Sequence, residues 1–135
     1  MACTFCAIVS GDLLAAKVLE DELTVAFLDA RPLFHGHVLL VPRAHVETLP
    51  DLPPDAVGPF FARAQELSVA VRDAMEAAGT FVAINNVVSQ SVPHLHCHIV
   101  PRRFKDGLRG FFWPRTKYAE RDAVAEAIAS RLASR

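Results

Sequence analysis

The sequence predicts an α+β fold with an antiparallel sheet, and three observations support this prediction. The runs TVAFLD (24–29) and HVLLV (37–41) are short and β-rich, and RPLFHG between them supplies the proline and glycine of a turn. Apolar residues over 55–78 recur at steps of three and four, which is the spacing of a helix. Strands with short connections, mixed with helices in this order, favour α+β with an antiparallel sheet.

The remaining elements follow from the same patterns. The apolar positions of the long helix are Val57, Phe60, Phe61, Ala64, Leu67, Val71 and Met75, and LPDLPP and Gly79 mark its two ends. TFVAIN (80–85) predicts a third strand, and HLHCHIV (94–100) predicts a fourth that ends at Pro101. A last helix carries Tyr118, Val124, Ile128 and Leu132 on one side.

Size and composition indicate a single soluble domain over residues 1–135. The chain is 52% hydrophobic and 21% charged, and no repeat or linker divides it. Fourteen basic and fifteen acidic side chains leave a net charge of −1, which argues against a nucleic-acid arm or a membrane-surface patch. The N-terminus lacks a signal-peptide pattern, and no apolar run is long enough to span a membrane. We therefore expect a cytoplasmic protein without a nucleic-acid or membrane partner.

Three histidines alternate with apolar residues in the fourth predicted strand. Side chains two apart on a strand share a face, so His94, His96 and His98 form a row while the residues between them point into the core. Neighbouring rings start about 6.6 Å apart, which is too far for one small cation but suits a bound phosphate. Neutral imidazole can attack phosphorus and form a covalent intermediate. The middle ring, His96, is the natural nucleophile, although a solvent-facing strand remains the simpler alternative.

This segment resembles the signature of the histidine triad (HIT) family of nucleotide hydrolases and transferases. HLHCHIV fits the pattern of three histidines spaced by apolar residues, with Cys97 at one apolar position. CTFCAIVSGD, VAFLDARPLFHGHVLLVPRAHVETLPDL and VPR also look like family segments in family order. The resemblance covers residues 3–103 and leaves 104–135 as a variable C-terminal segment with a helix. It implies a five-stranded antiparallel sheet, one long central helix, a C-terminal helix and a homodimer.

The resemblance also implies roles for individual residues. His96 matches the nucleophile at the α-phosphorus, and His98 and His37 match positions that contact the phosphate and assist the leaving group. Asp29 matches the residue that hydrogen-bonds the ribose hydroxyls, which is sound chemistry because a carboxylate accepts from two vicinal donors. The apolar positions that sandwich the base are matched by Phe5, Ile8 and Phe27. These apolar residues could equally be ordinary core on the sequence alone.

A structural zinc site is expected beside the triad, and no organic cofactor is expected. Cys3 and Cys6 have the two-residue gap of a zinc knuckle. By resemblance, His45 and His94 match the two further ligands that some bacterial HIT proteins use. Four protein ligands leave no open position, so such a zinc would hold structure and take no part in catalysis. A reducible disulfide or two free thiols is the alternative for the cysteine pair.

Two regions depart from the family pattern. Most relatives carry an asparagine, a glycine-bearing loop, then Gly-Gln and Ser or Thr before the triad, whereas this chain has INNVVSQSVPH, shorter and without glycine. Asn85, Gln90 and Ser91 match phosphate-contacting positions, with Asn86 as a competitor for the first. Pro93 cannot donate a ladder hydrogen bond, which indicates an edge strand or a bulge.

The second region, 102–118, has no family-wide counterpart. Its basic residues Arg102, Arg109, Arg115 and Lys117 suit the distal phosphates of a polyphosphate, and Phe112 or Trp113 suits a second base. A surface loop whose aromatics pack on a dimer partner is the alternative.

The leading functional hypothesis is an enzyme that acts on a small-molecule nucleotide. It would release a nucleoside monophosphate from a dinucleoside polyphosphate (Ap4A-like) or an adenosine phosphoramidate through a nucleotidyl-histidine. Three alternatives remain open: nucleotidyl transfer to phosphate, a nucleotide-binding module with an idle triad, and a metal-dependent hydrolase.

Overall fold

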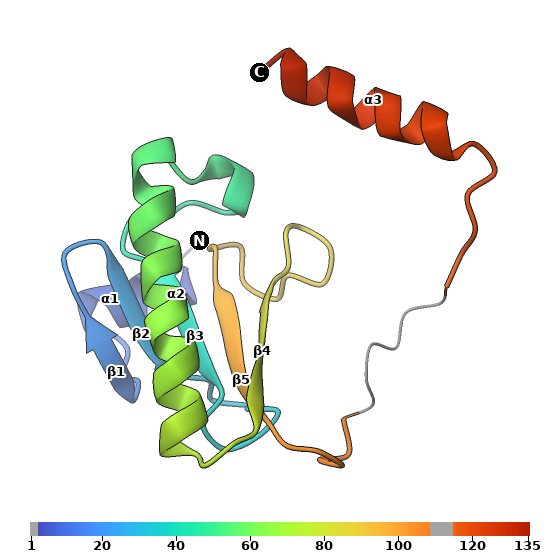
Figure 1. Ribbon diagram of the computed structural model, residues 1–135. Helices are drawn as coiled ribbons and strands as arrows, with labels where there is room; N and C mark the ends of the chain where they lie inside the picture. The colour runs from blue at the N-terminus through green and yellow to red at the C-terminus, as the bar shows by residue number, and fades with distance from the viewer. Residues whose placement is uncertain (1–2, 109–114) are drawn as a thin grey trace.

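The computed structural model describes residues 3–108 and 115–135 (Figure 1). Within these ranges, five strands form one antiparallel sheet in the order β1-β2-β3-β5-β4. The strands are β1 Lys17–Glu20, β2 Thr24–Leu28, β3 Val38–Pro42, β4 Gly79–Ile84 and β5 Cys97–Arg102. The helices are α1 Thr4–Ser10, α2 Pro54–Ala74 and α3 Arg121–Ala133, with a 3-10 turn at Leu49–Asp51. The predicted α+β fold is confirmed, including the sheet, the long central helix and the C-terminal helix.

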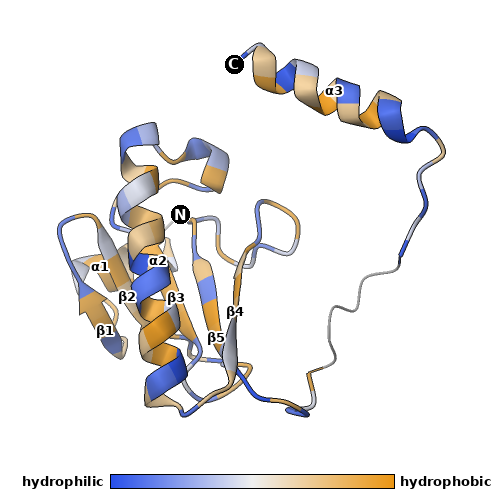
Figure 2. Ribbon diagram, viewed as in Figure 1, coloured by the Kyte–Doolittle hydropathy of each residue, from blue (hydrophilic) through white to orange (hydrophobic). Residues whose placement is uncertain are grey.

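The centre of the sheet is covered on both faces. Side chains alternate along β2 and β3, so Ala26 and Leu40 pack toward α2 while Phe27 and Leu39 pack toward α1. α2 covers its face with the buried residues Phe60, Ala64, Leu67 and Val71. This double cover explains why every residue of β3 is buried and why apolar residues run along these strands in Figure 2.

The long helix lies where the sequence placed it but ends earlier than predicted. It stops at Ala74 rather than at 78, because Glu76 adopts a φ of 52° in the left-handed region, which ends a helix. Two of the predicted inward positions, Val57 and Phe61, are 36% and 38% exposed. They lie at the margin of the buried face, so the core-facing stripe is narrower than the sequence pattern indicated.

The predicted strand over 94–100 is displaced toward the C-terminus. β5 begins at Cys97, because the residues before it bond elsewhere: the Leu95 N–H donates to the Val46 carbonyl, which lies after β3. His94 is fully buried in this bend. The expectation that Pro93 marks an edge strand is wrong, since β5 lies between β3 and β4 and Pro93 precedes it.

The C-terminal helix lies apart from the sheet in Figure 1. α3 begins at Arg121, so Tyr118 lies before the helix and not on its side as predicted. Residues 115–135 are all exposed, including Val124, Ile128 and Leu132 on the apolar side. None of the helices that the structure describes has the length and apolar character to cross a membrane.

Candidate active site

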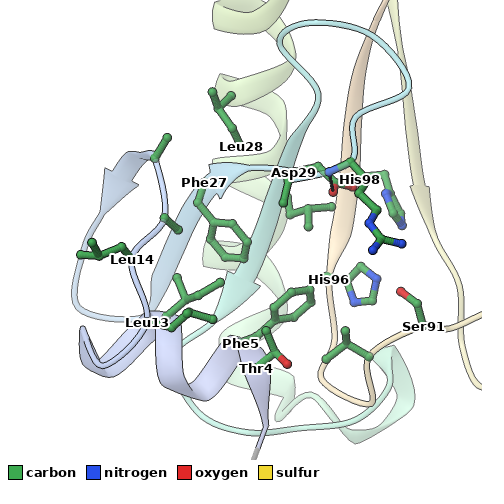
Figure 3. A pocket seen from close by; sticks show the side chains of 17 residues that line it. Thr4, Phe5, Leu13, Leu14, Phe27, Leu28, Asp29, Ser91, His96 and His98 are labelled. Atoms are coloured by element: carbon green, nitrogen blue, oxygen red, sulfur yellow. Dashed lines mark hydrogen bonds between the residues drawn. The ribbon is translucent and has the colours of Figure 1, made fainter.

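A cavity of about 750 Å³ lies between α1, residues 13–16, the end of β2 and the segment before β5 (Figure 3). Leu13, Leu14 and Phe27 lie on one side of it in Figure 3, and His96, His98, Asp29 and Ser91 on the other, with Phe5 between them. The apolar lining residues are Phe5, Ile8, Leu13, Leu14, Ala15, Ala16, Phe27, Leu28, Ala30, Leu39 and Val92. The polar lining residues are Thr4, Asp29, Arg31, Ser91, His96 and His98.

Local structure at α1 brings the apolar wall to this position. Cys3 caps the helix by accepting from the Cys6 N–H, and Gly11 ends it with a φ of 88° that favours glycine. Phe5 and Ile8 are three residues apart, share one face of the helix and are both buried. Phe5 contacts Phe27 edge to face with ring centroids 5.4 Å apart. These side chains form a wall suited to a flat apolar ring.

His96 lies where this wall meets the polar side, and its hydrogen bond defines its tautomer. The ring of Phe5 meets the ring of His96 edge to face at 5.0 Å. The Nδ1 atom of His96 is 2.8 Å from the His94 carbonyl oxygen, which can only accept, so Nδ1 carries the proton. The other ring nitrogen, Nε2, is therefore unprotonated in the neutral ring and has a free lone pair. That is the nitrogen a nucleophilic histidine requires.

His98 is oriented by a chain of hydrogen bonds that begins at the backbone. The Leu33 N–H donates to Nδ1 of His37 at 3.0 Å, so the proton of neutral His37 is on Nε2. That Nε2–H donates to Nδ1 of His98, 3.0 Å away. His98 consequently carries its proton on Nε2, a donor suited to a phosphate or leaving-group oxygen. Asp29 Oδ2 is 3.6 Å from His37 Nε2 and stabilises positive charge there.

We expect acid to destabilise the fold through these rings. Burial, followed by the charges of His96 and His37, lowers the pKa of His98 to about 4. Its pKa in the unfolded chain is about 6.5, so between these values the unfolded state binds a proton that the folded state does not. The contribution of neutral His98 is complete above pH 6.5 and is lost as the pH falls toward 4. Urea unfolding at about pH 7 and about pH 5 tests this. The midpoint should fall on acidification, and by less in His98→Asn; an equal fall in both proteins contradicts the assignment.

The structure gathers seven of the predicted catalytic and nucleotide-binding residues around the cavity. These are Phe5, Ile8, Phe27, Asp29, Ser91, His96 and His98. His37 is buried behind His98 and reaches the cavity through that ring. Asn85 and Gln90 are not among the lining residues. Their roles toward a ligand remain predictions, as do those of the other predicted site residues.

The glycine-free loop before the triad is held by side-chain hydrogen bonds. Gln90 accepts from the Val87 N–H at 2.9 Å and donates to the Glu47 carbonyl at 2.5 Å, while Asn86 accepts from the Leu49 N–H at 2.8 Å. Val87 and Ser89 adopt φ values of 68° and 61°, a region where glycine is at ease and a β-branched residue is strained. The loop therefore keeps glycine-like backbone conformations without glycine, fastened to residues 47–49.

The four predicted metal ligands come together at the N-terminus of α1. The ligand atoms of Cys3, Cys6, His45 and His94 all lie within 4.8 Å of one another. His94 Nε2 is 2.8 Å from the Pro42 carbonyl oxygen and must donate to it, which leaves Nδ1 unprotonated and free to bind a cation. Burial and the neighbouring Cys3 raise the pKa of Cys6, so two thiolates here would need a cation to compensate their charge.

The distances in this cluster fit a tetrahedral zinc ion. Zinc bond lengths imply separations of about 3.6 Å between sulfur and nitrogen and about 3.3 Å between two nitrogens. His94 Nδ1 lies 3.5 Å from Cys3 Sγ, 3.6 Å from Cys6 Sγ and 3.2 Å from His45 Nδ1. Cys6 Sγ lies 3.3 Å from His45 Nδ1. The three cysteines of the chain are free in this structure, so it contains no Cys3–Cys6 disulfide.

A second group of ligand types does not fit a metal. Asp29, His37 and His98 also lie within 4.8 Å of one another. His37 accepts a backbone hydrogen bond at Nδ1, so a metal at Nε2 would require the ring to lose its remaining proton. This trio is better described as a hydrogen-bonded relay than as a metal site.

The segment 102–118 is only partly described. Arg102 donates to both carboxylate oxygens of Asp106 and to the Leu108 carbonyl, so it is fully engaged away from the cavity. Arg115 and Lys117 are exposed and do not line the cavity. Arg109, Phe112 and Trp113, which the sequence also singled out, lie outside the described residues.

Several cavity residues were not predicted. Leu13, Leu14 and Leu39 form apolar wall, and no chemical pattern distinguishes them from other leucines in the sequence. Arg31 also lines the cavity. Arg31 could have been considered from the sequence, because it lies two residues after the predicted site residue Asp29 in the turn DARPLFHG.

Fold and site together define a small α+β protein in which His96 and His98 line a cavity of about 750 Å³ with an apolar wall. The HIT domain model matches residues 11–105, and the chain belongs to the HIT family. The assignment of all of 1–135 to one domain remains a prediction.

Three similar proteins each align with nearly the whole chain. Protein hit of Bacillus subtilis is 36% identical over 138 residues, spanning 98% of this chain and 95% of that protein. An adenylylsulfatase of Arabidopsis thaliana is 31% identical over 98% of this chain and 66% of that protein. An adenosine 5'-monophosphoramidase of Schizosaccharomyces pombe is 28% identical over 98% of this chain and 99% of that protein.

Solved structures agree with the fold. A HIT family protein from Bacillus subtilis superposes with a TM-score of 0.88 at 34% identity, covering 97% of each chain. A zinc-bound histidine triad family protein from Mycobacterium smegmatis gives a TM-score of 0.76 at 39% identity, covering 99% of this chain and 97% of that one.

Proposed function

We propose that this HIT family protein hydrolyses nucleotides at the α-phosphate and releases a nucleoside monophosphate. The observation that supports this most strongly is the tautomer of His96. Its Nδ1 proton is held by the His94 carbonyl, and Nε2 is left as a free nucleophile beside the apolar wall. His98 supplies a hydrogen-bond donor next to it, with the two ring centroids 5.0 Å apart.

The reaction proceeds by two displacements at phosphorus. His96 Nε2 attacks the α-phosphorus, the bond to the leaving group breaks with its electron pair, and the Nε2–H of His98 donates a hydrogen bond to the departing atom. Water then attacks phosphorus, and the P–Nε2 bond breaks with its electrons returning to His96. For a basic leaving group, the Nε2–H proton of His98 is transferred to the departing atom in the first step, and the attacking water returns a proton to His98 in the second. The two protons of water therefore end, in the net reaction, on the nucleoside monophosphate and on the leaving group. Nothing in this sequence of steps needs a metal at the α-phosphate.

Product analysis tests this function. The wild-type protein is incubated with adenosine phosphoramidate, diadenosine polyphosphates and adenylyl sulfate, and products are separated by liquid chromatography with mass detection. The proposal requires release of AMP with one water consumed. AMP binding without any product would instead favour a nucleotide-binding module, and ADP formed only when phosphate is added would favour nucleotidyl transfer.

We propose that Asp29 binds the ribose, and Asp29→Asn is expected to weaken binding in a sugar-dependent way. Its Oδ1 accepts from the Arg31 N–H at 2.9 Å, its Oδ2 lies 3.6 Å from His37 Nε2, and Asp29 lines the cavity. Loss of the charged acceptor should raise KM about tenfold for ribonucleotide substrates, and much less for 2′-deoxy substrates. Steady-state kinetics on both sugars checks this. A fall in kcat of equal size for both would show that Asp29 acts through His37 and not on the ribose.

We propose that a structural zinc ion is held by Cys3, Cys6, His45 and His94. The ligand distances and the free Nδ1 of His94 support this, and a related histidine triad protein is zinc-bound. A zinc ion at this site would cross-link the start of α1, through Cys3 and Cys6, to His94 of the triad. Because Phe5 lies between Cys3 and Cys6 in the chain, the same cross-link would fix the part of the apolar wall that α1 supplies.

We propose also that two copies of the chain associate. A 13-residue helix is marginal in water unless its apolar side is covered. The apolar side of α3 is exposed in the single chain, with Ile128 59% and Leu132 67% accessible. A second copy, as expected from the family resemblance, would provide the missing cover.

A further inference from the structure

One cationic side chain lines the cavity. Among the lining residues that the structure describes, Arg31 is the single lysine or arginine. It is exposed, and within residues 3–108 and 115–135 its guanidinium makes no hydrogen bond or ion pair. Other arginines of the same body are engaged: Arg43 and Arg63 with Asp21, and Arg102 with Asp106. Arg31 therefore has its charge available to a ligand.

The backbone places Arg31 beside the polar side of the cavity. Its N–H donates to Oδ1 of Asp29 at 2.9 Å, and the following Pro32 cannot continue the strand. The other carboxylate oxygen of Asp29 is 3.6 Å from His37 Nε2, which in turn contacts His98. The Arg31 side chain therefore branches from the backbone beside Asp29, on the same side of the cavity as His98. The side chains of the apolar wall, Phe5, Ile8 and Phe27, offer a guanidinium no anion and no hydrogen-bond acceptor.

The polar side otherwise lacks fixed positive charge. Burial lowers the pKa of His37 and of His98, so both rings are neutral near pH 7 and supply hydrogen bonds only. Asp29 adds a negative charge to the same surface. A substrate that carries a second anionic group beyond the α-phosphate would meet repulsion from Asp29 unless a cation compensates, and a guanidinium matches phosphate and sulfate oxygens in geometry.

We propose that Arg31 is a specificity-determining residue that binds an anionic tetrahedral group, phosphate or sulfate, attached beyond the α-phosphate of the substrate. It selects substrates with an anionic leaving group over those with an uncharged amine. This rests on the proposed function, because it names the leaving group of that same reaction. The interaction is charge-assisted and lies at an exposed rim, so it weakens as salt is added.

The test compares leaving groups that differ in charge. kcat/KM is measured for diadenosine tetraphosphate, adenylyl sulfate and adenosine phosphoramidate with wild type, Arg31→Gln and Arg31→Lys. Arg31→Gln should lower kcat/KM for the anionic leaving groups by about 10- to 100-fold and for the phosphoramidate by less than about threefold. Arg31→Lys should recover part of the loss. The matched control is Arg72→Gln, which removes the same charge on α2 away from the cavity.

Each outcome decides the proposal. A loss confined to one of the two anionic substrates supports it and identifies that anion as the occupant. An equal loss on all three substrates, or no loss on any, overturns it.

A binding measurement separates this proposal from the proposed function. If wild type releases AMP from none of the substrates, the proposed hydrolysis is wrong. Calorimetry then compares the affinities for ADP and AMP and tests whether Arg31 binds a phosphate beyond the α-phosphate. Arg31→Gln should abolish any preference for ADP over AMP. A preference that persists in Arg31→Gln, or a wild type that binds ADP no better than AMP, overturns the role of Arg31.

Discussion

Replacing His96 with alanine should reduce turnover by about 10⁴-fold or more, because the atom that forms the bond to phosphorus is removed. Binding of the product nucleoside monophosphate should change by less than about threefold, since the wall of Phe5, Ile8 and Phe27 remains. The small loss of packing against Phe5 should not unfold the protein. Steady-state turnover and AMP calorimetry on the same preparation measure the two effects separately.

The matched control for this change is His35→Ala. His35 is an exposed histidine in the turn before His37 and does not line the cavity. Its removal should leave turnover unchanged. If His96→Ala retained more than about a tenth of wild-type activity, His96 would not be the nucleophile.

Replacing Cys6 with serine should remove the zinc ion and destabilise the protein. Wild type should contain one zinc per chain and the variant none, as measured by elemental analysis. Loss of a structural metal removes a few kcal/mol or more of folding free energy, which corresponds to a fall in Tm on the order of 10 °C. Because α1 is then no longer tied to His94, Phe5 should lose its fixed position and KM for nucleotides should rise.

Cys97→Ala is the control that separates metal loss from general destabilisation. Cys97 is fully buried in the core against α2 and lies outside the metal cluster. This variant should lower Tm through a small cavity while keeping its zinc. A wild-type protein without zinc, or a Cys6→Ser variant with a full zinc content, would contradict the proposed metal site.

Much of the fold was predictable because it depends on local periodicity. β2, β3, β4 and α2 combine a strong apolar pattern with turn residues at their ends, and all four lie close to their predicted positions. β1 was missed because it is a short, largely exposed edge strand whose pairing with β2 is what defines it. α1 was missed because its seven residues are held by the Cys3 cap and by tertiary packing, which propensity does not register.

In the site, too, features that depend on local sequence were predicted, and those that depend on distant contacts were not. The spacing of the triad histidines and of the cysteine pair indicates their chemistry, and the family resemblance adds Asp29, His37 and His45. The structure brings these residues into two clusters. The bend at His94 could not be read from the alternation, because it arises when Leu95 bonds to Val46, a contact distant in sequence. That bend separates two functions of His94: its side chain turns toward Cys3, Cys6 and His45, while its carbonyl accepts the Nδ1 proton of His96.

A covalent nucleotidyl intermediate on His96 would leave its mark on the stereochemical course of the reaction at phosphorus. A substrate with a chiral α-phosphorothioate is hydrolysed in isotopically labelled water, and the configuration of the product is determined. Two successive displacements each invert the configuration at phosphorus, so net retention is expected. Net inversion would show that water attacks the α-phosphorus directly and would contradict the role of His96 as nucleophile.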